Sequence, residues 1–256
     1  MGAPILEIRG VSKRFGKLAA VDDLSLSVQT GAIFGIIGPN GAGKSTLFNL
    51  VSGVSRPDSG EILFDGVDVA GWHSDAIARA GIGRTFQNLR LFGYLSAREN
   101  VMIGGHARLK ATLFDSLLNT PRARREERAA LSRADELLAR FDLAADAARF
   151  ARNLPYGGQR RLEIARALAG QPQLLLLDEP AAGANAAEKR ALVDLVRAIN
   201  AAGTTVVLIE HDMGVVMELC HRIAVLDYGV KIAEGDGAEV RANPRVIEAY
   251  LGTPDA

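Results

Sequence analysis

Apolar residues recur along the chain with two spacings, one typical of strands and one typical of helices. Residues 6–11 (LEIRGV) and 24–28 (LSLSV) alternate between apolar and polar side chains, which predicts half-buried strands. A glycine-containing turn in residues 227–237 leads into a last short strand. More continuous apolar runs predict buried strands at residues 31–38, 174–179, 204–211 and 222–227.

Helical spacing fills the segments between these strands. Residues 44–53 (KSTLFNLVSG) predict a helix that ends at Gly53 as its C-cap. From about Leu95 to Phe150 the pattern is helical, and a further helix is expected around residues 192–199. The pattern as a whole predicts an α/β core that is interrupted by a helical insertion and has a small β element near its start.

Composition narrows the classes of protein that fit this architecture. With 48% hydrophobic residues, the chain of 256 residues can bury a substantial core. Its 30 basic and 30 acidic residues leave no net charge, which argues against non-specific nucleic-acid binding. Glu126 and Glu127 interrupt the arginines of residues 122–128, so these charges predict a solvated helix face rather than a binding patch.

No segment of the sequence predicts a membrane anchor. No apolar run approaches the roughly 18 residues needed to span a bilayer, and the first residues lack the basic-then-apolar layout of a signal peptide. We therefore expect any role at a membrane to depend on a partner.

Residues 38–46 (GPNGAGKST) carry the strongest chemical signal, because they match G-x-x-x-x-G-K-[ST] between a predicted strand and a predicted helix. Such a loop cradles the phosphates of a nucleotide with its backbone N–H groups. Lys44 would contact the β- and γ-phosphates, Ser45 would offer its hydroxyl to Mg²⁺, and Thr46 would lie near the phosphates. The residues expected to bind ATP here are Gly38, Pro39, Asn40, Gly41, Ala42, Gly43, Lys44, Ser45 and Thr46.

Two carboxylates at the end of a buried strand, Asp178 and Glu179 in LLLLDEP, supply the second half of such a site. Asp178 would hold Mg²⁺, directly or through water, and Glu179 would polarise the attacking water. A nucleotide kinase needs no such water-activating base, so the pair favours hydrolysis.

A second glycine-containing helix start lies in residues 153–168 (NLPYGGQRRLEIARAL). Bare N–H groups at the positive end of a helix dipole favour an anion. At this point the chain resembles the ATP-binding-cassette (ABC) ATPases, whose motifs recur here in the family's order as GPNGAGKST, RTFQN, LPYGGQ, LLLLDEP, PAAGAN and VLIEH.

The resemblance implies a P-loop NTPase (RecA-like) core with a small antiparallel β subdomain and an inserted α-helical subdomain. Residues 1–256 would form a single ABC ATPase domain. Within it, residues 1–87 would form the nucleotide-binding core with the β subdomain, and about 88–157 the helical subdomain with the signature. Residues 158–256 would complete the core and end in a C-terminal helix.

The resemblance also implies roles for single residues. Gln87 would reach the metal and the water, His211 would contact the γ-phosphate, and Phe15 would stack on adenine. In this family two cassettes face each other head to tail, so that the P-loop of one and the signature of the other close on the same γ-phosphate. The signature residues, which would bind the partner's ATP, are Leu154, Pro155, Tyr156, Gly157 and Gly158. Taken singly, Gln87 would fit a surface residue, His211 a structural hydrogen-bonder and Phe15 a core residue.

The signature departs from the family's Leu-Ser-Gly-Gly-Gln. Pro155 removes both the serine hydroxyl and its N–H, and Gly158 stands in place of the glutamine. We expect a weaker contact with the γ-phosphate and slower turnover than a serine would give. Alternatively, a partner cassette with a standard signature completes this chain's site, which leaves one strong and one weak site.

Flanking segments such as GIGRTFQNLRLFGYLSARENVMIG and VIEAYLG resemble one ATPase subunit of bacterial high-affinity branched-chain amino-acid importers, a subfamily with a helical insertion after GGHARL. That resemblance implies ATP and Mg²⁺ as cofactors. The implied partners are a second ABC ATPase subunit, in a homodimer or heterodimer, two membrane permeases and a periplasmic solute-binding protein, with no nucleic acid. It places the chain peripherally on the cytoplasmic face of the bacterial inner membrane. Residues that would dock a permease helix, or else belong to the helical core, are Leu89, Leu91, Phe92 and Tyr94.

Other functions stay open on the sequence alone. The solute could be urea, another amino acid or an amide, because the substrate never touches this chain in such systems. A soluble ABC ATPase of DNA repair or translation is an alternative, although such proteins usually carry long coiled coils or two cassettes. A P-loop nucleotide kinase would need neither Glu179 nor a signature, and an ATP-gated dimer that rarely hydrolyses would be consistent with Pro155.

Overall fold

The computed structural model describes residues 3–108 and 120–251, and the chain divides into two compact units. The first unit comprises Met1–Ile77 and Gln173–Ala256, and the second comprises Ala78–Pro172. A helical insertion is expected after GGHARL, and residues 109–119, at that point of the chain, lie outside the described residues.

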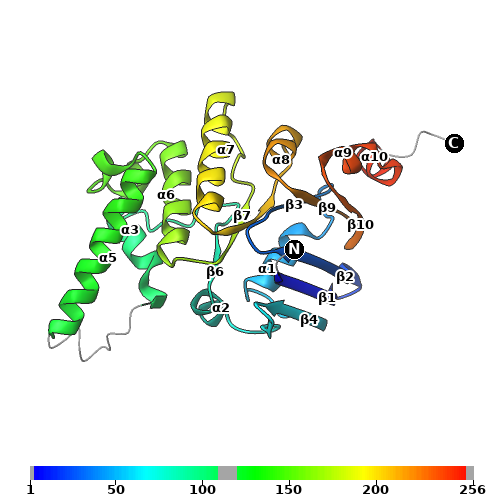
Figure 1. The fold of residues 1–256 in the computed structure, drawn as a ribbon, viewed down its shortest axis with the longest axis horizontal. Coiled ribbons are helices and arrows are strands. Elements are labelled where there is room, and N and C mark those ends of the chain that lie inside the picture. Colours follow the sequence, from blue (N-terminus) through cyan, green and yellow to red (C-terminus); the bar gives the residue numbers. More distant parts are fainter. Residues whose placement is uncertain (1–2, 109–119, 252–256) are drawn as a thin grey trace. The chain divides into compact units, whose positions relative to one another are not determined.

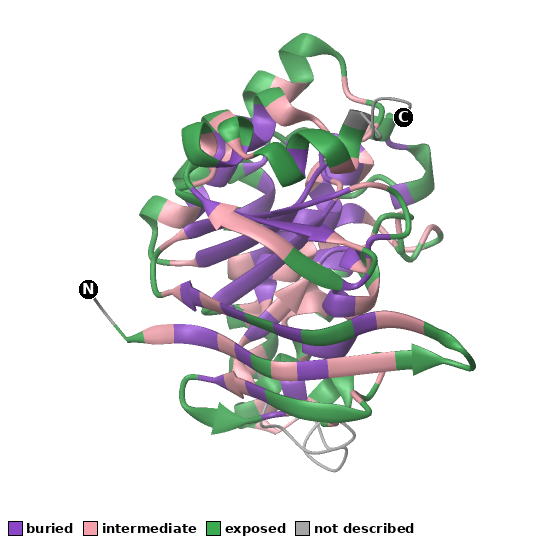
Figure 2. Ribbon diagram, turned by 90° about the vertical axis from the view of Figure 1, so that its right-hand side faces the viewer, coloured by how far each residue is buried: buried purple, intermediate pink, exposed green. Residues whose placement is uncertain are grey.

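A mostly parallel sheet forms the centre of the first unit. Its strands follow the order β10-β9-β3-β8-β7, in which β3 is parallel to β8 and β9, β7 is parallel to β8, and β10 is antiparallel to β9. All residues of β3, β7 and β8 are buried, as the apolar runs predicted, and the buried strands are purple in Figure 2. The bounds are β3 (Ile33–Ile37), β7 (Leu174–Asp178), β8 (Thr205–Ile209), β9 (Arg222–Asp227) and β10 (Val230–Gly235).

Helices alternate with these strands, which confirms the predicted α/β class (Figure 1). The prediction for the first helix was wrong by one residue, because its C-cap is Ser52 and Gly53 follows with φ 68°. The C-terminal region forms two helices where one was expected, and both contribute apolar side chains to a cluster with Ile37 and Val216. The bounds are α1 (Lys44–Val51), α7 (Ala186–Ala201), α8 (Met213–Leu219), α9 (Gly237–Ala242) and α10 (Pro244–Leu251); α2 (Ser74–Ala80) crosses the boundary between the units.

A second, antiparallel sheet in the first unit is the β element expected near the start of the chain. Its strand order is β2-β1-β4-β5, and the hairpin of β1 and β2 turns between Phe15 and Leu18. The bounds are β1 (Pro4–Phe15), β2 (Leu18–Gln29), β4 (Ser59–Phe64) and β5 (Val67–Asp68).

The second unit is mainly helical, with α3, α5 and α6 packed against one another. Leu131, Ala134, Leu138 and Phe141 recur at helical spacing; Ala134, Leu138 and Phe141 are buried in this unit, whereas Leu131 is exposed. The charges of α5 lie on a solvated face, where Arg122 and Glu126 pair at 3.4 Å. The bounds are β6 (Ile82–Arg84), α3 (Ala97–Gly104), α5 (Pro121–Arg140) and α6 (Tyr156–Ala169), with short 3-10 turns at His106–Arg108, Ala144–Asp146 and Ala151–Asn153.

This second unit is wider than the helical subdomain expected at about 88–157. It includes all of α6 because that helix packs on α3 and α5. Across residues 3–108 and 120–251, no helix combines the length and the apolarity that a bilayer crossing requires.

Candidate nucleotide-binding site

The loop between β3 and α1 has the backbone that a phosphate cradle needs. Gly38, Gly41 and Gly43 have φ of 147°, 83° and 97°, a region that side chains other than glycine rarely adopt. A Cβ on Gly43 would collide with the carbonyl oxygen of Ala20 in β2. Helix α1 starts with no side-chain cap and no acidic residue in its first turn. An anion can therefore take the place of the missing cap.

Lys44 points its ammonium into this loop. Its Nζ donates hydrogen bonds to the carbonyl oxygens of Gly38 at 2.7 Å and Pro39 at 2.9 Å. Burial lowers the pKa of Lys44, while the charges of Glu179 and Asp178 act in the opposite direction. The lysine and both predicted carboxylates thus lie within electrostatic reach of one another, and this arrangement fits a nucleotide phosphate with its metal.

Glu179 and His211 meet because their strands are parallel neighbours. Asp178, the last residue of β7, pairs with Ile209, the last residue of β8, so the residues after both strands lie at the same sheet edge. His211 Nε2 lies 2.7 Å from Glu179 Oε1. An ionised carboxylate only accepts, so Nε2 donates in the state in which Glu179 is ionised. Glu179 has φ 48°, a conformation that costs free energy in a non-glycine residue and is concentrated at functional sites.

Phe15 lies at the tip of the hairpin that touches the P-loop. Its ring is 53% exposed, and Lys13 Nζ lies 5.7 Å from the ring centroid. The same hairpin contains Ala20, whose carbonyl packs against Gly43. The alternative that Phe15 is a core residue is excluded by this exposure, and the exposed ring can accept a stacking partner.

The signature residues lie in the second unit, at the start of α6. Pro155 is the N-cap and its side chain accepts no hydrogen bond from the helix N–H groups, and no acidic residue lies in the first turn. Tyr156, Gly157 and Gly158 follow as the first helical residues. Gln87 lies in the same unit, exposed in the loop that follows β6.

The sequence matches the ABC transporter family over residues 21–182 and the branched-chain amino acid ATP-binding cassette transporter family over residues 230–256. It is 46% identical over 253 residues to the high-affinity branched-chain amino acid transport ATP-binding protein LivG of Escherichia coli K12, covering 98% of this chain and 99% of LivG. The chain belongs to the ABC transporter family.

Solved ATP-binding cassettes share its fold. A nucleotide-free cassette from an ABC transporter superposes with a TM-score of 0.85 at 32% identity, covering 97% of this chain and 99% of that one. A dimeric post-hydrolysis state of the cassette MJ0796, bound to ADP and Pi, gives 0.77 at 27% identity, covering 90% and 98%. The α/β P-loop NTPase fold of this cassette is therefore established.

Glu210 is a residue of the cassette's site that the sequence analysis missed. Its buried Oε1 accepts the N–H of Ala181 at 2.6 Å, and Oε2 accepts the N–H of His211 at 3.1 Å. Burial raises the pKa of this carboxyl, although the backbone donors act against the shift. Glu210 thereby joins the loop after Glu179 to the position of His211. The available signal was an acid that directly continues the apolar run TVVLI.

Glu163 is the second missed residue, and it lies in the second unit on α6. Its Oε1 accepts the N–H groups of Phe86 at 3.3 Å and Arg90 at 3.4 Å, on either side of Gln87. Burial raises the pKa of this carboxyl too, with the same donors and two arginines opposing the shift. Both units thus use a buried glutamate to hold the backbone of a loop that carries a predicted site residue.

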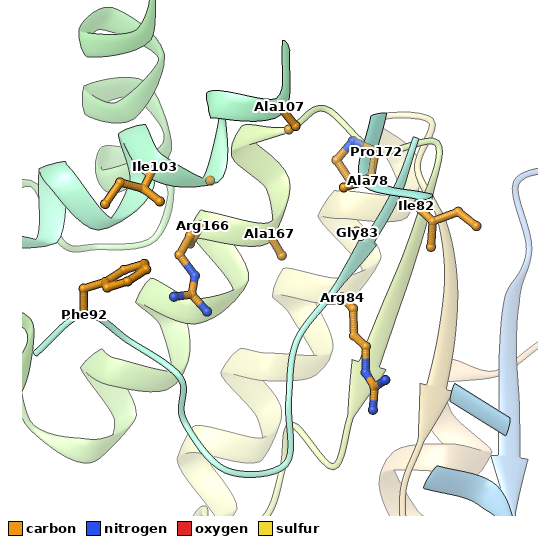
Figure 3. Close-up of a pocket in the computed structure, with 12 residues that line it drawn as sticks. Ala78, Ile82, Gly83, Arg84, Phe92, Ile103, Ala107, Arg166, Ala167 and Pro172 are labelled. Carbon is orange, nitrogen blue, oxygen red and sulfur yellow. The ribbon is translucent and has the colours of Figure 1, made fainter. Parts of the chain in front are cut away.

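A pocket of about 230 Å³ opens beside this loop within the second unit (Figure 3). Figure 3 shows the ring of Phe92 from the loop, Ile103 from α3 and the guanidinium of Arg166 from α6 around it. Phe92 and Tyr94 are 50% and 76% exposed. These two side chains therefore lie at the surface rather than in the helical core, whereas Leu89 and Leu91 are half-buried.

The structure brings together the predicted residues of each unit separately. The first unit assembles the P-loop, Asp178, Glu179 and His211, with the hairpin of Phe15 against Gly43. The second unit holds Gln87 and the signature turn, joined through α6.

Proposed function

We propose that this cassette is the ATP-hydrolysing subunit of a membrane importer for branched-chain amino acids. The observation that carries the hydrolytic part is the 2.7 Å contact between Glu179 and His211. It lies at the sheet edge whose charges act on the P-loop lysine. A carboxylate held by a histidine beside a phosphate cradle suits the activation of water.

In the proposed reaction, water attacks the γ-phosphorus of ATP, the bond to the bridging oxygen breaks, and ADP and phosphate leave. Glu179 polarises the water, and His211 positions that carboxylate and contacts the γ-phosphate. Lys44 would exchange its two carbonyl contacts for phosphate oxygens. Ser45, Asp178 and Gln87 would hold Mg²⁺, which when bound neutralises charge on the phosphates.

We infer that the second helix start serves a partner's nucleotide. The uncapped N-terminus of α6 offers N–H groups and a positive dipole end but no cation among its first residues. Such a site suits a phosphate that the P-loop of a partner cassette already binds. The relative MJ0796 is a dimer in its post-hydrolysis state with ADP and Pi, which supports the same arrangement here.

The pocket beside Gln87 is our candidate for the contact with a permease. It is lined by apolar atoms of Phe92 and Ile103 and by the cationic Arg166. An amphipathic cytoplasmic helix that places an apolar residue in this pocket would press on the loop that carries Gln87. The cassette would then sit peripherally at the cytoplasmic side of the inner membrane, with a periplasmic binding protein completing the importer.

The cargo assignment is supported by the relative LivG, named for branched-chain amino acid transport, and by the family match at the C-terminus. Uptake of labelled leucine, isoleucine and valine should be restored when this chain and its own permeases are expressed in cells that lack such an importer. Restoration of urea uptake alone would reject the cargo but leave the ATPase assignment intact.

Hydrolysis is tested in purified protein by phosphate release with Mg²⁺ and ATP. Glu179→Gln should lower kcat by at least about 100-fold, because the base that polarises water is lost. Glu127→Gln, on the exposed face of α5, is the matched control and should keep the parent rate. Equal rates for the parent and Glu179→Gln would reject the proposed role of this carboxylate.

A further inference from the structure

Three charged side chains of α6, spaced three residues apart, contact the backbone of the loop around Gln87. Glu163 Oε1 accepts the N–H groups of Phe86 and Arg90. Arg160 Nη1 donates to the carbonyl of Phe86 at 3.2 Å, and Arg166 Nη1 donates to the carbonyl of Arg90. The set Arg160–Glu163–Arg166 therefore binds both the N–H and the C=O at each end of the segment 86–90.

The same set reaches the signature turn through Arg160. Its second guanidinium nitrogen, Nη2, donates to the hydroxyl of Tyr156 at 3.2 Å. Tyr156 directly follows Pro155 and is the first residue of α6. A single planar guanidinium thus joins the signature to the loop of Gln87, and its fixed fork transmits position better than a flexible ammonium would.

Burial strengthens this link. The Glu163 side chain is 1% exposed and that of Arg160 is 9% exposed, with 3.7 Å between Arg160 Nη1 and Glu163 Oε2. Arg166 Nη2 lies 4.0 Å from Glu163 Oε1 on the other side. Hydrogen bonds in such a low-dielectric network are stronger and more interdependent than at a surface.

Stability alone does not account for the set. A buried ion pair contributes little net stability compared with apolar residues of similar volume, because desolvation opposes it. What the charged set adds is a defined position for four backbone groups that flank Gln87.

We propose that Arg160, Glu163 and Arg166 are positioning residues that tie the placement of Gln87 to the signature turn at Tyr156. A displacement of that turn by a partner's nucleotide would then change the position of Gln87 in the same chain. The proposal deepens the proposed function and rests on it for the roles of Gln87 and the signature.

The test is hydrogen–deuterium exchange of the segment 86–90 in the full-length chain without nucleotide. Glu163→Gln keeps the side-chain volume but removes the charge, and it should speed exchange there about tenfold, as the loss of charge-assisted hydrogen bonds predicts. Tyr156→Phe removes only the hydroxyl and should speed exchange of the same segment severalfold. The double variant should resemble Glu163→Gln alone, because both changes act through one network.

Arg98→Gln is the matched control, since Arg98 forms a 2.7 Å ion pair with Asp135 in the same unit. It should leave exchange of 86–90 at the parent rate. The proposal is overturned by a parent-like loop in Tyr156→Phe, or by faster exchange spread equally over α5 and the loop.

A kinetic readout separates positioning from general destabilisation. Glu163→Gln should lower kcat for ATP with little change in KM, because Lys44 and the P-loop still bind the nucleotide. If both variants exchange faster than the parent in segment 86–90 but the parent hydrolyses no ATP, the proposed function fails. The link between Gln87 and the signature turn through α6 would still stand. An unchanged kcat together with faster loop exchange would overturn the positioning role.

Discussion

Helices α1 and α6 begin without a side-chain cap, whereas their neighbours are capped. Among the described α-helices with a defined N-cap residue, the remaining ones use an oxygen side chain, from Ser96, Thr120, Asn185, Asp212 and Asp236. A missing cap leaves N–H groups without a side-chain acceptor. The two exceptions are the two helix starts that the sequence assigns to phosphate.

The two starts differ in what they add to the dipole. Helix α1 follows three glycines with positive φ and brings a buried lysine. Helix α6 follows Pro155 at φ −56° and ψ 155°, an extended conformation, and brings no cation in its first turn. In the proposed mechanism the first start holds the triphosphate of its own chain, and the second completes a site that a partner's P-loop has already filled.

The largest effect is expected at the lysine that distinguishes α1 from α6. Lys44→Ala removes the only charge that the P-loop directs at the phosphates and should lower kcat/KM for ATP at least about 100-fold. Isothermal titration with ATP should show a matching loss of affinity. If the variant binds ATP as tightly as the parent, Lys44 contributes nothing to ATP affinity, and the proposed difference between the starts of α1 and α6 is contradicted.

Alanine substitution should affect the free energy of unfolding differently at the two glycine turns. Gly43→Ala forces a left-handed residue against the Ala20 carbonyl and should lower the free energy of unfolding by about 1–3 kcal/mol. At Gly158 a Cβ would meet Leu154 at 3.5 Å, an ordinary contact, so Gly158→Ala should be neutral or stabilise by about 0.5–1 kcal/mol. Urea denaturation measures both, and equal destabilisation would contradict the difference in backbone strain.

Restoring the family's serine at the start of α6 should strengthen the contact of this helix start with the γ-phosphate. Pro155→Ser supplies a hydroxyl and an N–H where α6 begins, and we expect kcat to rise about fivefold through better contact with the γ-phosphate. Steady-state phosphate release at saturating ATP is the measurement. An unchanged rate would indicate that this step does not depend on the signature contact, or that a different partner supplies it.

The smallest effect is expected at α8, a helix that has a side-chain cap and serves as the reference for the two uncapped starts. Asp212 caps α8 and pairs with Lys189 at 2.6 Å, and the hydrogen bond from Lys189 holds the pKa of Asp212 below its usual value. Asp212→Ala should lower the free energy of unfolding by about 1 kcal/mol at neutral pH.

The pH dependence of that effect follows from the lowered pKa. The cap contributes fully above the unfolded pKa of about 3.9 and is lost as the pH falls through the lower folded pKa. The difference between parent and Asp212→Ala should therefore shrink below about pH 4. A difference that grows in acid would contradict this sign.

The sequence predicted those parts of the cassette that depend on local pattern. The apolar runs gave the buried strands β3, β7, β8 and β9, and the P-loop motif placed Lys44 at the start of α1. The contact between Glu179 and His211 was not predicted, because strand pairing across 32 residues leaves no local signal.

The buried glutamates could not be recognised in the same way. Glu163 and Glu210 act on backbone N–H groups of distant segments, and a backbone donor looks alike in every residue of a sequence. The sequence bounds of the second unit could not be predicted either, since they depend on which helices α6 packs against. In each case the missing information was a tertiary contact rather than a local preference.

In the proposed mechanism, two helix starts from different chains meet at one triphosphate. Sedimentation velocity of Glu179→Gln at saturating ATP tests this, because the variant binds nucleotide without releasing the partner. We expect a stable dimer that returns to monomer when ATP is removed. A sample that stays monomeric at saturating ATP would contradict the shared site.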